Sequence, residues 1–185
     1  MTFSDFTSLV TSSPDGVVLL EGRRGIPHDA ATQAEGLARS LALRFSLLRF
    51  RSGNAEGSDE AFSRGVDAVD PSRLQVIAPY ATHRKSVRYA DALYDSPDSL
   101  SRVQEDEIAY KTNVASPKNE SLISKWGQKG RLAAKATYLI RDTMKVTGYS
   151  EAFPRPICAL FYVDPDDPLA GGTGHTIRVC QQEGV

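Results

Sequence analysis

Residues 17–20 read Val-Val-Leu-Leu, a short apolar run that stands between the turn residues Pro14-Asp15-Gly16 and Gly22. Because the run contains β-branched residues and is closed on both sides by turn formers, it predicts a strand that is buried on both faces. Strands of this kind belong to parallel sheets, in which helices cover both faces. The run therefore predicts that helices and further short apolar strands alternate along the chain.

The residues that follow fit this expectation. Apolar residues at helical spacing predict a helix from about Ala30 to Leu47, with Asp29 as its N-cap behind Pro27. A second strand should end at Phe50–Ser52, and a second helix should span Asp59–Val69. The stretch Leu74–Ala78 predicts a third strand. Strands that are separated by helices and short connections pair in parallel through right-handed crossovers.

The second half is less regular before it returns to the same pattern. Residues 80–116 are polar, with weak periodicity, and predict loops and short helices. A short helix is expected at Asn119–Trp126, a longer one at Lys129–Lys145, and a buried strand at Ile157–Val163. A loop at 164–174 leads into a last helix that carries Ile177, Val179 and Cys180. We therefore expect one α/β domain over residues 1–185, Rossmann-like and doubly wound. Its mainly parallel sheet should have about five strands and helices on both faces, with a less regular insertion at about 81–116.

Length and composition narrow the function classes. The chain has 185 residues, with 22 Lys and Arg against 23 Asp and Glu, which gives a net charge of −1. That balance argues against a uniformly basic nucleic-acid coat, and no run approaches the roughly 20 apolar residues of a membrane helix. The first residues lack the basic flank and apolar stretch of a signal peptide, and two cysteines make no disulfide framework. These features predict a cytoplasmic protein with no membrane partner.

The charges are unevenly distributed. Residues 56–107 contain eleven acids and six bases, whereas residues 111–145 contain eight bases and two acids. The basic stretch could attract phosphates or a nucleic-acid backbone, or it could be the solvated face of a helix.

Ligands of open parallel sheets collect beyond the carboxyl ends of the strands, so the loops that follow the strands are the candidate site. Their glycines allow close approach of a ligand, Arg23 offers a cation, and several loops run into helices whose free N–H groups favour anions. Tyr80 could stack on a base, and His175 could donate to a phosphate as a neutral imidazole. The predicted ligand-binding residues are Gly22, Arg23, Ser52, Gly53, Asn54, Gly57, Ser58, Asp59, Pro79, Tyr80, Gly171, Gly172, Thr173, Gly174 and His175.

These motifs resemble those of the SLOG superfamily, which joins the DNA-processing protein DprA (Smf) and the LOG phosphoribohydrolases. Residues 52–59, Ser-Gly-Asn-Ala-Glu-Gly-Ser-Asp, are similar to its S-G-G-A-x-G-x-D element, and Gly22-Arg23 to its G-S-R element. Residues 171–178 resemble its late G-G-T motif. The similarity is greatest to the small stand-alone DprA-like proteins of bacteria and phages. It implies a Rossmann-like fold with a nucleotide-type ligand at this rim.

Departures from the family pattern favour binding over catalysis. LOG enzymes carry P-G-G-x-G-T-x-x-E, whereas here Ala170, His175 and Arg178 replace the Pro, the Thr and the Glu. The leading hypothesis is therefore the binding or sensing of a nucleotide or an ADP-ribose-like ligand. The alternative is an N-glycosidic phosphoribohydrolase that acts on nucleoside monophosphates, in which another acid takes over the role of the missing Glu. The acids available for that role are Glu21, Glu56, Asp59 and Glu60.

A second alternative, suggested by the resemblance to DprA, is single-stranded DNA binding through residues 118–145, although the neutral net charge argues against it. No Cys/His cluster indicates a metal, and no cofactor is predicted. Cys158 and Cys180 are interpreted as core residues. Related folds commonly dimerise, so a homodimer stays an open alternative.

Overall fold

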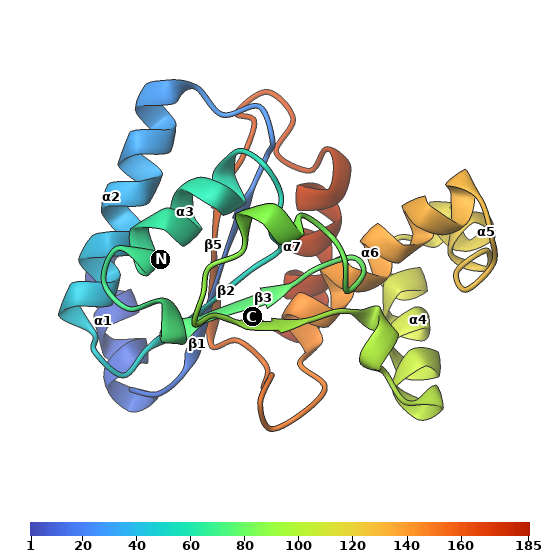
Figure 1. Cartoon of the computed structure of the whole chain (residues 1–185), viewed down its shortest axis with the longest axis horizontal. Coiled ribbons are helices and arrows are strands. Elements are labelled where there is room, and N and C mark those ends of the chain that lie inside the picture. The colour runs from blue at the N-terminus through green and yellow to red at the C-terminus, as the bar shows by residue number, and fades with distance from the viewer.

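A computed structural model describes all 185 residues and contains a five-stranded sheet in which every neighbouring pair is parallel (Figure 1). The strand order is β4-β3-β2-β1-β5, so the first strand lies between the second and the last. This confirms the predicted doubly wound α/β fold. The strands are β1 (Val17–Gly22), β2 (Arg49–Ser52), β3 (Leu74–Ile77), β4 (Leu93–Asp95) and β5 (Cys158–Tyr162). The helices are α1 (Phe3–Ser12), α2 (His28–Arg44), α3 (Ser58–Asp67), α4 (Arg102–Ala115), α5 (Glu120–Ile123), α6 (Arg131–Thr147) and α7 (Gly171–Glu183).

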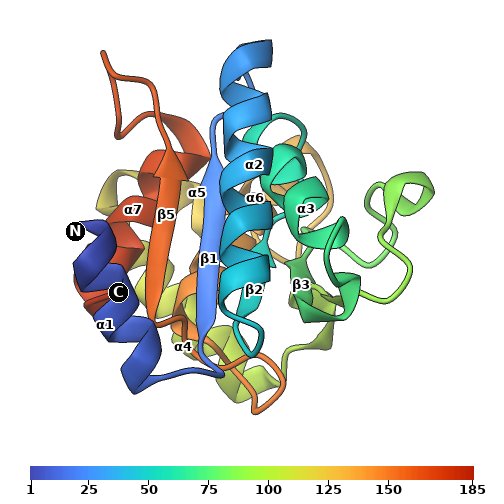
Figure 2. The ribbon, with the colours of Figure 1, turned by 90° about the vertical axis from the view of Figure 1, so that its left-hand side faces the viewer.

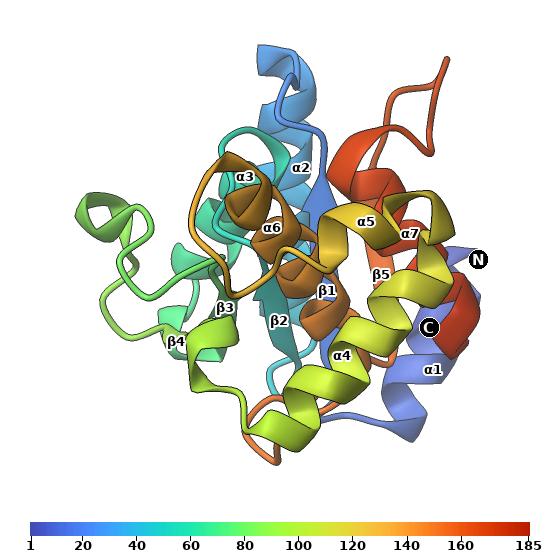
Figure 3. The ribbon, with the colours of Figure 1, turned by 90° about the vertical axis from the view of Figure 1, so that its right-hand side faces the viewer.

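Helices cover both faces of the sheet. Helices α1, α2 and α3 pack on one face (Figure 2), where 16 buried apolar residues form one continuous core. Helices α4, α6 and α7 cover the other face (Figure 3), where the apolar residues form two smaller clusters of six and five. The second face therefore leaves room for other kinds of buried side chain.

The strand that decides the fold is the central one. All six residues of β1 are buried. Val18 is opposite Phe50 of β2 on one side and opposite Cys158 of β5 on the other. The chain winds outward from β1 to β4 and then crosses to β5 on the opposite side, so the winding direction reverses between β1 and β5. In open α/β sheets this switch point is where ligands bind.

Residues 81–116 are more regular than predicted. They contribute the edge strand β4, which pairs with β3, and the 14-residue helix α4. Ser101 and Gln104 form a reciprocal capping box at the start of α4. Only Ile108, Thr112 and Ala115 of this helix are buried, which explains its weak apolar periodicity.

Two further differences lie near the N-terminus. The sequence reasoning did not assign α1, which begins with a capping box of Thr2 and Asp5 and buries Phe6 and Val10 in the core. Helix α2 begins at His28 with Pro27 at its N-cap, so Asp29 lies in the first turn and does not cap the helix. None of the helices combines the length and the apolar composition needed to span a membrane.

Candidate functional site

A cavity of about 360 Å³ opens at the switch point, and we call it the switch-point cavity. The end of β1 and the residues that follow it (21–24), the loop after β5 (163–170) and the start of α7 (171–173) surround it. Helix α6 contributes Tyr138, Arg141 and Asp142, the β2–α3 connection contributes Ala55, and the first turn of α3 contributes Asp59. Four segments that are far apart in the sequence therefore meet where the sheet topology predicts a ligand.

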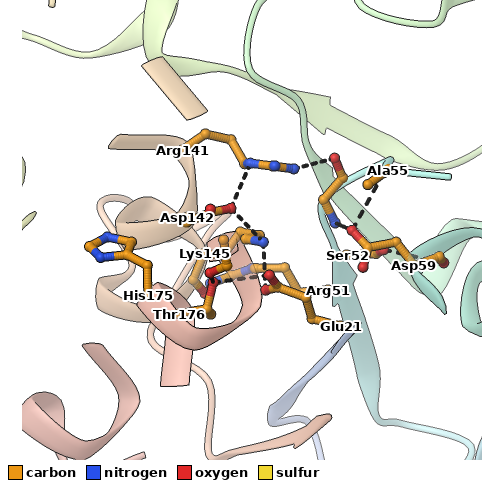
Figure 4. Close-up of polar contacts among 12 residues, drawn as sticks. Glu21, Arg51, Ser52, Ala55, Asp59, Arg141, Asp142, Lys145, His175 and Thr176 are labelled. Carbon is orange, nitrogen blue, oxygen red and sulfur yellow. Dashed lines mark hydrogen bonds and ion pairs between the residues drawn. The ribbon is translucent and has the colours of Figure 1, made fainter. Parts of the chain in front are cut away.

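Buried charged residues form the floor of this cavity (Figure 4). The Nζ of Lys145 lies 2.5 Å from Oε2 of Glu21 and 2.9 Å from Oδ1 of Asp142. The Nε of Arg141 lies 2.9 Å from the same Oδ1, and its Nη1 donates to the carbonyl of Gly53. The hydroxyl of Thr176 donates to Oε1 of Glu21 at 3.0 Å.

Asp59 completes this floor cluster, which consists of Glu21, Asp59, Arg141, Asp142 and Lys145. Its carboxylate accepts hydrogen bonds from the backbone N–H groups of Gly22 at 3.2 Å and Gly53 at 3.1 Å. Asp59 therefore ties the loop after β1 to the loop after β2. The cluster has three carboxyl groups and two cations, so one negative charge is unbalanced when all five groups are ionised.

The excess of acids is reflected in the pKa values of the floor cluster. Burial raises the pKa of Glu21 to about 7, although Lys145 opposes the shift. Burial also raises the pKa of Asp59. At Asp142 burial acts in the same direction, but Arg141 and Lys145 outweigh it and lower the pKa. Glu21 is therefore the group of the floor that can take up or release a proton near neutral pH.

The rim of the cavity carries two arginines, Arg23 and Arg24, two acids, Asp164 and Asp167, and free backbone N–H groups. The Nη1 of Arg23 lies 2.5 Å from Oδ2 of Asp164, and this ion pair joins the loops after β1 and β5. Arg24 is exposed, forms no ion pair, and lies with its guanidinium 6.0 Å from the centre of the Tyr138 ring. The first turn of α7 begins at Gly171 and has no side-chain cap, so its N–H groups can bind an anion.

Six of the fifteen predicted residues line the switch-point cavity. They are Gly22, Arg23, Asp59, Gly171, Gly172 and Thr173. The other nine lie outside its lining and are Ser52, Gly53, Asn54, Gly57, Ser58, Pro79, Tyr80, Gly174 and His175.

Four of these nine residues lie where one segment of the chain contacts another. The hydroxyl of Ser58 donates to the carbonyl of Arg23 at 2.7 Å, and the hydroxyl of Ser52 donates to the carbonyl of Asp59 at 3.4 Å. A side chain at Gly53 would meet Arg141, with its Cβ 2.2 Å from Nη1. At Gly174 it would meet the carbonyl of Leu169. These two glycines are required because segments of the chain approach each other closely, whereas Gly172 faces the cavity and only Oδ2 of Asp142 lies nearby, 3.0 Å from the Cβ position.

His175 is fully buried and does not line the cavity. Its Nδ1 lies 2.8 Å from the hydroxyl of Ser116, and its Nε2 lies 3.1 Å from the hydroxyl of Thr143. Burial lowers the pKa of His175, so the ring is neutral as predicted, but both of its nitrogens are already bonded within the protein. The ring joins α7 to α4 and α6, and it is not free to donate to a phosphate at the rim.

The basic stretch divides into two parts. Arg141 and Lys145 are buried in the floor cluster, and Lys111 is paired with Glu107 and Glu183. These three bases are therefore not available to a DNA backbone. The exposed remainder lies around α5 and the first turns of α6 and consists of Lys118, Lys125, Lys129, Arg131 and Lys135.

The sequence reasoning missed the contribution of α6. Tyr138, Arg141 and Asp142 have the i, i+3 and i+4 spacing of one helix face, on a helix whose remaining buried residues are largely apolar. Charged residues placed within such an apolar pattern were the available signal for a buried polar site. The cysteines fit their predicted role, because burial raises the pKa of Cys158 to about 11 and of Cys180 to about 12. No group of three or more His, Cys, Asp or Glu side chains is arranged to hold a metal ion.

Comparisons with known proteins leave the family resemblance untested, so it stays a prediction. A scan of protein-family models, a search of curated proteins and a search of solved structures each find no match to the chain.

Proposed function

We propose that the protein binds a nucleotide or a nucleotide-derived ligand, such as one of the ADP-ribose type, in the switch-point cavity. One observation carries this proposal. The uncapped N-terminus of α7 lies beside Arg23 and Arg24, at the point where the winding direction of the sheet reverses. Backbone N–H groups and guanidinium groups are the donors that phosphates prefer in proteins.

The distribution of charge suggests how such a ligand lies. Its phosphates belong at the rim, near Gly171, Gly172 and the two arginines, because the floor holds three carboxyl groups and only two cations. Hydroxyl groups of a ribose suit the floor. Oδ2 of Asp142 accepts no hydrogen bond within the protein and lies against Gly172, so it is free to accept one from a sugar hydroxyl.

Isothermal titration calorimetry with AMP, ADP and ADP-ribose tests the proposal. We expect at least one of these ligands to bind with a Kd below about 1 mM, which corresponds to roughly −4 kcal/mol. Gly172→Val would place a branched side chain between Asp142 and the cavity, and it should weaken binding at least about tenfold, or ~1.4 kcal/mol.

Gly36→Ala is the matched control. Gly36 lies in α2, and a Cβ there meets no other atom within 4 Å, so the variant should bind like the wild type. Absence of binding by all three ligands would overturn the proposal. If Gly172→Val and Gly36→Ala weakened ligand binding equally, the ligand would not bind in the switch-point cavity.

A second candidate function is hydrolysis of an N-glycosidic bond, and the pKa of Glu21 favours it. A carboxyl group with a pKa of about 7 that lines a cavity can act as a general acid or base at neutral pH. Both of its oxygens are bonded, to Lys145 and to Thr176, so a catalytic role requires one of these contacts to open.

Chromatographic detection of free base and ribose 5-phosphate tests this second candidate on a panel of nucleoside monophosphates. If the protein is a hydrolase, Glu21→Gln should remove turnover while nucleotide binding persists, because the amide keeps the shape of the side chain. If the wild type releases no base from any of the nucleotides, the protein is a binding protein and not a hydrolase.

A further inference from the structure

A second cavity, of about 180 Å³, adjoins the switch-point cavity, and we call it the loop cavity. Three residues line both cavities, namely Arg24, Ala55 and Tyr138. The other residues of the loop cavity are Glu56, His83 and Arg84. One ligand could therefore reach both cavities along the side chains of Arg24 and Tyr138.

Basic side chains outnumber acids in the lining of the loop cavity. Two guanidinium groups and one imidazole face a single lining acid, Glu56. Arg24 has no acidic partner, and the Nη2 of Arg84 lies 2.8 Å from Oε2 of Glu60. The pKa of His83 is lowered by burial and then by Arg141, Arg84, Arg24 and Arg88. The surroundings of this imidazole are therefore positive, as an anion would require.

The wall shared by the two cavities is aromatic. The guanidinium groups of Arg24 and Arg141 lie 6.0 Å and 5.7 Å from the centre of the Tyr138 ring. The His83 ring stands nearly perpendicular to it, with 6.2 Å between ring centres. An aromatic ring among cations suits the flat part of a ligand that carries negative charge elsewhere.

The backbone is strained at two residues beside the loop cavity. Asn54 and Arg84 are the only residues other than glycine with positive φ, at 53° and 44°. The Nη1 of Arg84 donates to the carbonyl of Asn54 at 3.3 Å, so the two strained residues hold each other. The segment between β3 and β4 stands away from the sheet (Figure 3), yet this contact fixes it over the cavity. Strain of this kind persists where the surrounding structure enforces it, and it is concentrated at binding sites.

We propose that the loop cavity is a second anion subsite, so that the ligand is a nucleotide with two phosphate groups on separate arms. One phosphate binds at the start of α7 and the other binds between Arg24 and Arg84, with the nucleoside part against Tyr138. This proposal rests on the proposed nucleotide-binding function and narrows its ligand class.

Three nucleotides with the same base show whether the separation of two phosphates on the ligand, and not their number alone, increases the affinity. AMP has one phosphate, ADP has two that are contiguous, and adenosine 3′,5′-bisphosphate has two on separate arms. Calorimetry on the full chain should give a Kd for the bisphosphate at least about tenfold lower than for AMP and for ADP. This comparison uses the wild-type protein, so it decides the question even if a variant fails to fold.

Two neighbouring substitutions then locate the effect. Arg84→Asn removes the cation but keeps a residue that tolerates positive φ, whereas Lys85→Asn removes an exposed cation on the same loop that does not line the cavity. Arg84→Asn should abolish the advantage of the bisphosphate and leave the Kd for AMP unchanged. Lys85→Asn should leave both Kd values near those of the wild type.

The failures are distinguishable. If ADP binds as tightly as the bisphosphate, or if both variants weaken the bisphosphate equally, the second subsite is wrong and the proposed nucleotide site stands. If none of the three nucleotides binds, the proposed function is itself wrong, and the subsite is wrong with it.

Discussion

The two faces of the sheet are built from different chemistry. Beneath α1, α2 and α3 the buried residues are apolar and form one cluster. Beneath α6 and α7 the apolar clusters are small, and buried charges accompany them, among them Arg51, Lys145 and Glu21. The first face therefore serves to stabilise the fold, whereas the second face also shapes the candidate site. A buried charge tolerates the loss of its partner poorly, so the second face should be the more sensitive of the two to single substitutions.

Arg51 shows how much of the second face depends on such bonds. It lies in the middle of β2 and is fully buried. Its Nη1 donates to the carbonyl of Lys145 and its Nη2 to that of Pro154, while Gln75 on the neighbouring strand accepts from Nε and Nη2. Burial lowers the pKa of Arg51 to about 10. This one side chain fixes the connection from α6 to β5. Strand β5 in turn leads into the loop 163–170, which lines the switch-point cavity.

The largest effect should come from Lys145→Met. The variant leaves the carboxylates of Glu21 and Asp142 buried without their shared cation, and we expect a loss of about 3–5 kcal/mol in the free energy of unfolding. Lys145 lowers the pKa of Glu21, so without it Glu21 binds its proton more tightly and the cost should be smaller at pH 5 than at pH 8. Urea unfolding at both pH values measures this. A cost that is the same at both would contradict the account of the floor cluster.

Leu41→Ala makes the corresponding change on the apolar face. Leu41 is buried in the large cluster, and its truncation should cost about 3 kcal/mol through lost contacts and the cavity left behind. No titrating group is involved, so urea unfolding should give the same cost at pH 5 and at pH 8. A strong pH dependence would show that the two faces are not independent.

Glu21→Gln should change the pH dependence of stability by a moderate amount. The folded-state pKa of Glu21 is about 7, which lies above its ordinary value of 4.5, so the folded state holds a proton that the unfolded state has lost. Stability from this group is therefore fully present below pH 4.5 and is lost as the pH rises toward 7. Relative to the wild type, the amide variant should gain on the order of 1–3 kcal/mol between pH 5 and pH 8. Parallel stability curves for the two proteins would contradict the raised pKa.

Arg24→Gln should have the smallest effect on stability. Arg24 is exposed and forms no ion pair, so the free energy of unfolding should change by less than about 0.5 kcal/mol. Nucleotide binding should nevertheless weaken, because Arg24 lines both cavities. Thermal unfolding together with calorimetry separates the two effects, and a large fall in Tm would assign Arg24 a structural role instead.

Sequence reasoning predicted the fold well because the strands buried on both faces leave a local signal. Val17–Leu20 is an apolar run and Leu74–Ala78 is apolar apart from Gln75, and each is confirmed as a strand to within two residues at either end. Helix α4 buries only three residues, so its apolar periodicity is too weak to predict it. The only local signal of this helix is the capping box of Ser101 and Gln104. A helix that packs against the core through so few residues has little apolar periodicity in its sequence.

The site was predicted only in part, because its geometry depends on contacts between residues that are far apart in the chain. The loops after β1 and before α7 were found from the rule for strand ends. Lys145 has the same local signal as Arg141 and Asp142, a charge within the apolar pattern of α6, but no local pattern identifies its partner Glu21, which lies 124 positions earlier. The three glycines before His175 predict a position at the rim. In the structure its ring is buried and lies within hydrogen-bond distance of the hydroxyls of Ser116 and Thr143. Those two hydroxyls become neighbours of His175 only once α4, α6 and α7 have packed.

The pairing of the first strand with the last also has a consequence for synthesis. β1 pairs with β5 from Val18 opposite Cys158 to Gly22 opposite Tyr162, about 140 residues apart. While a ribosome extends the chain, β1 keeps one unpaired edge until residues 158–162 have emerged, and an unpaired edge is prone to aggregation. The switch-point cavity is completed later still, when Gly171 and the rest of α7 have folded onto the sheet. A nascent chain thus has no complete switch-point cavity until the five-stranded sheet and α7 have assembled.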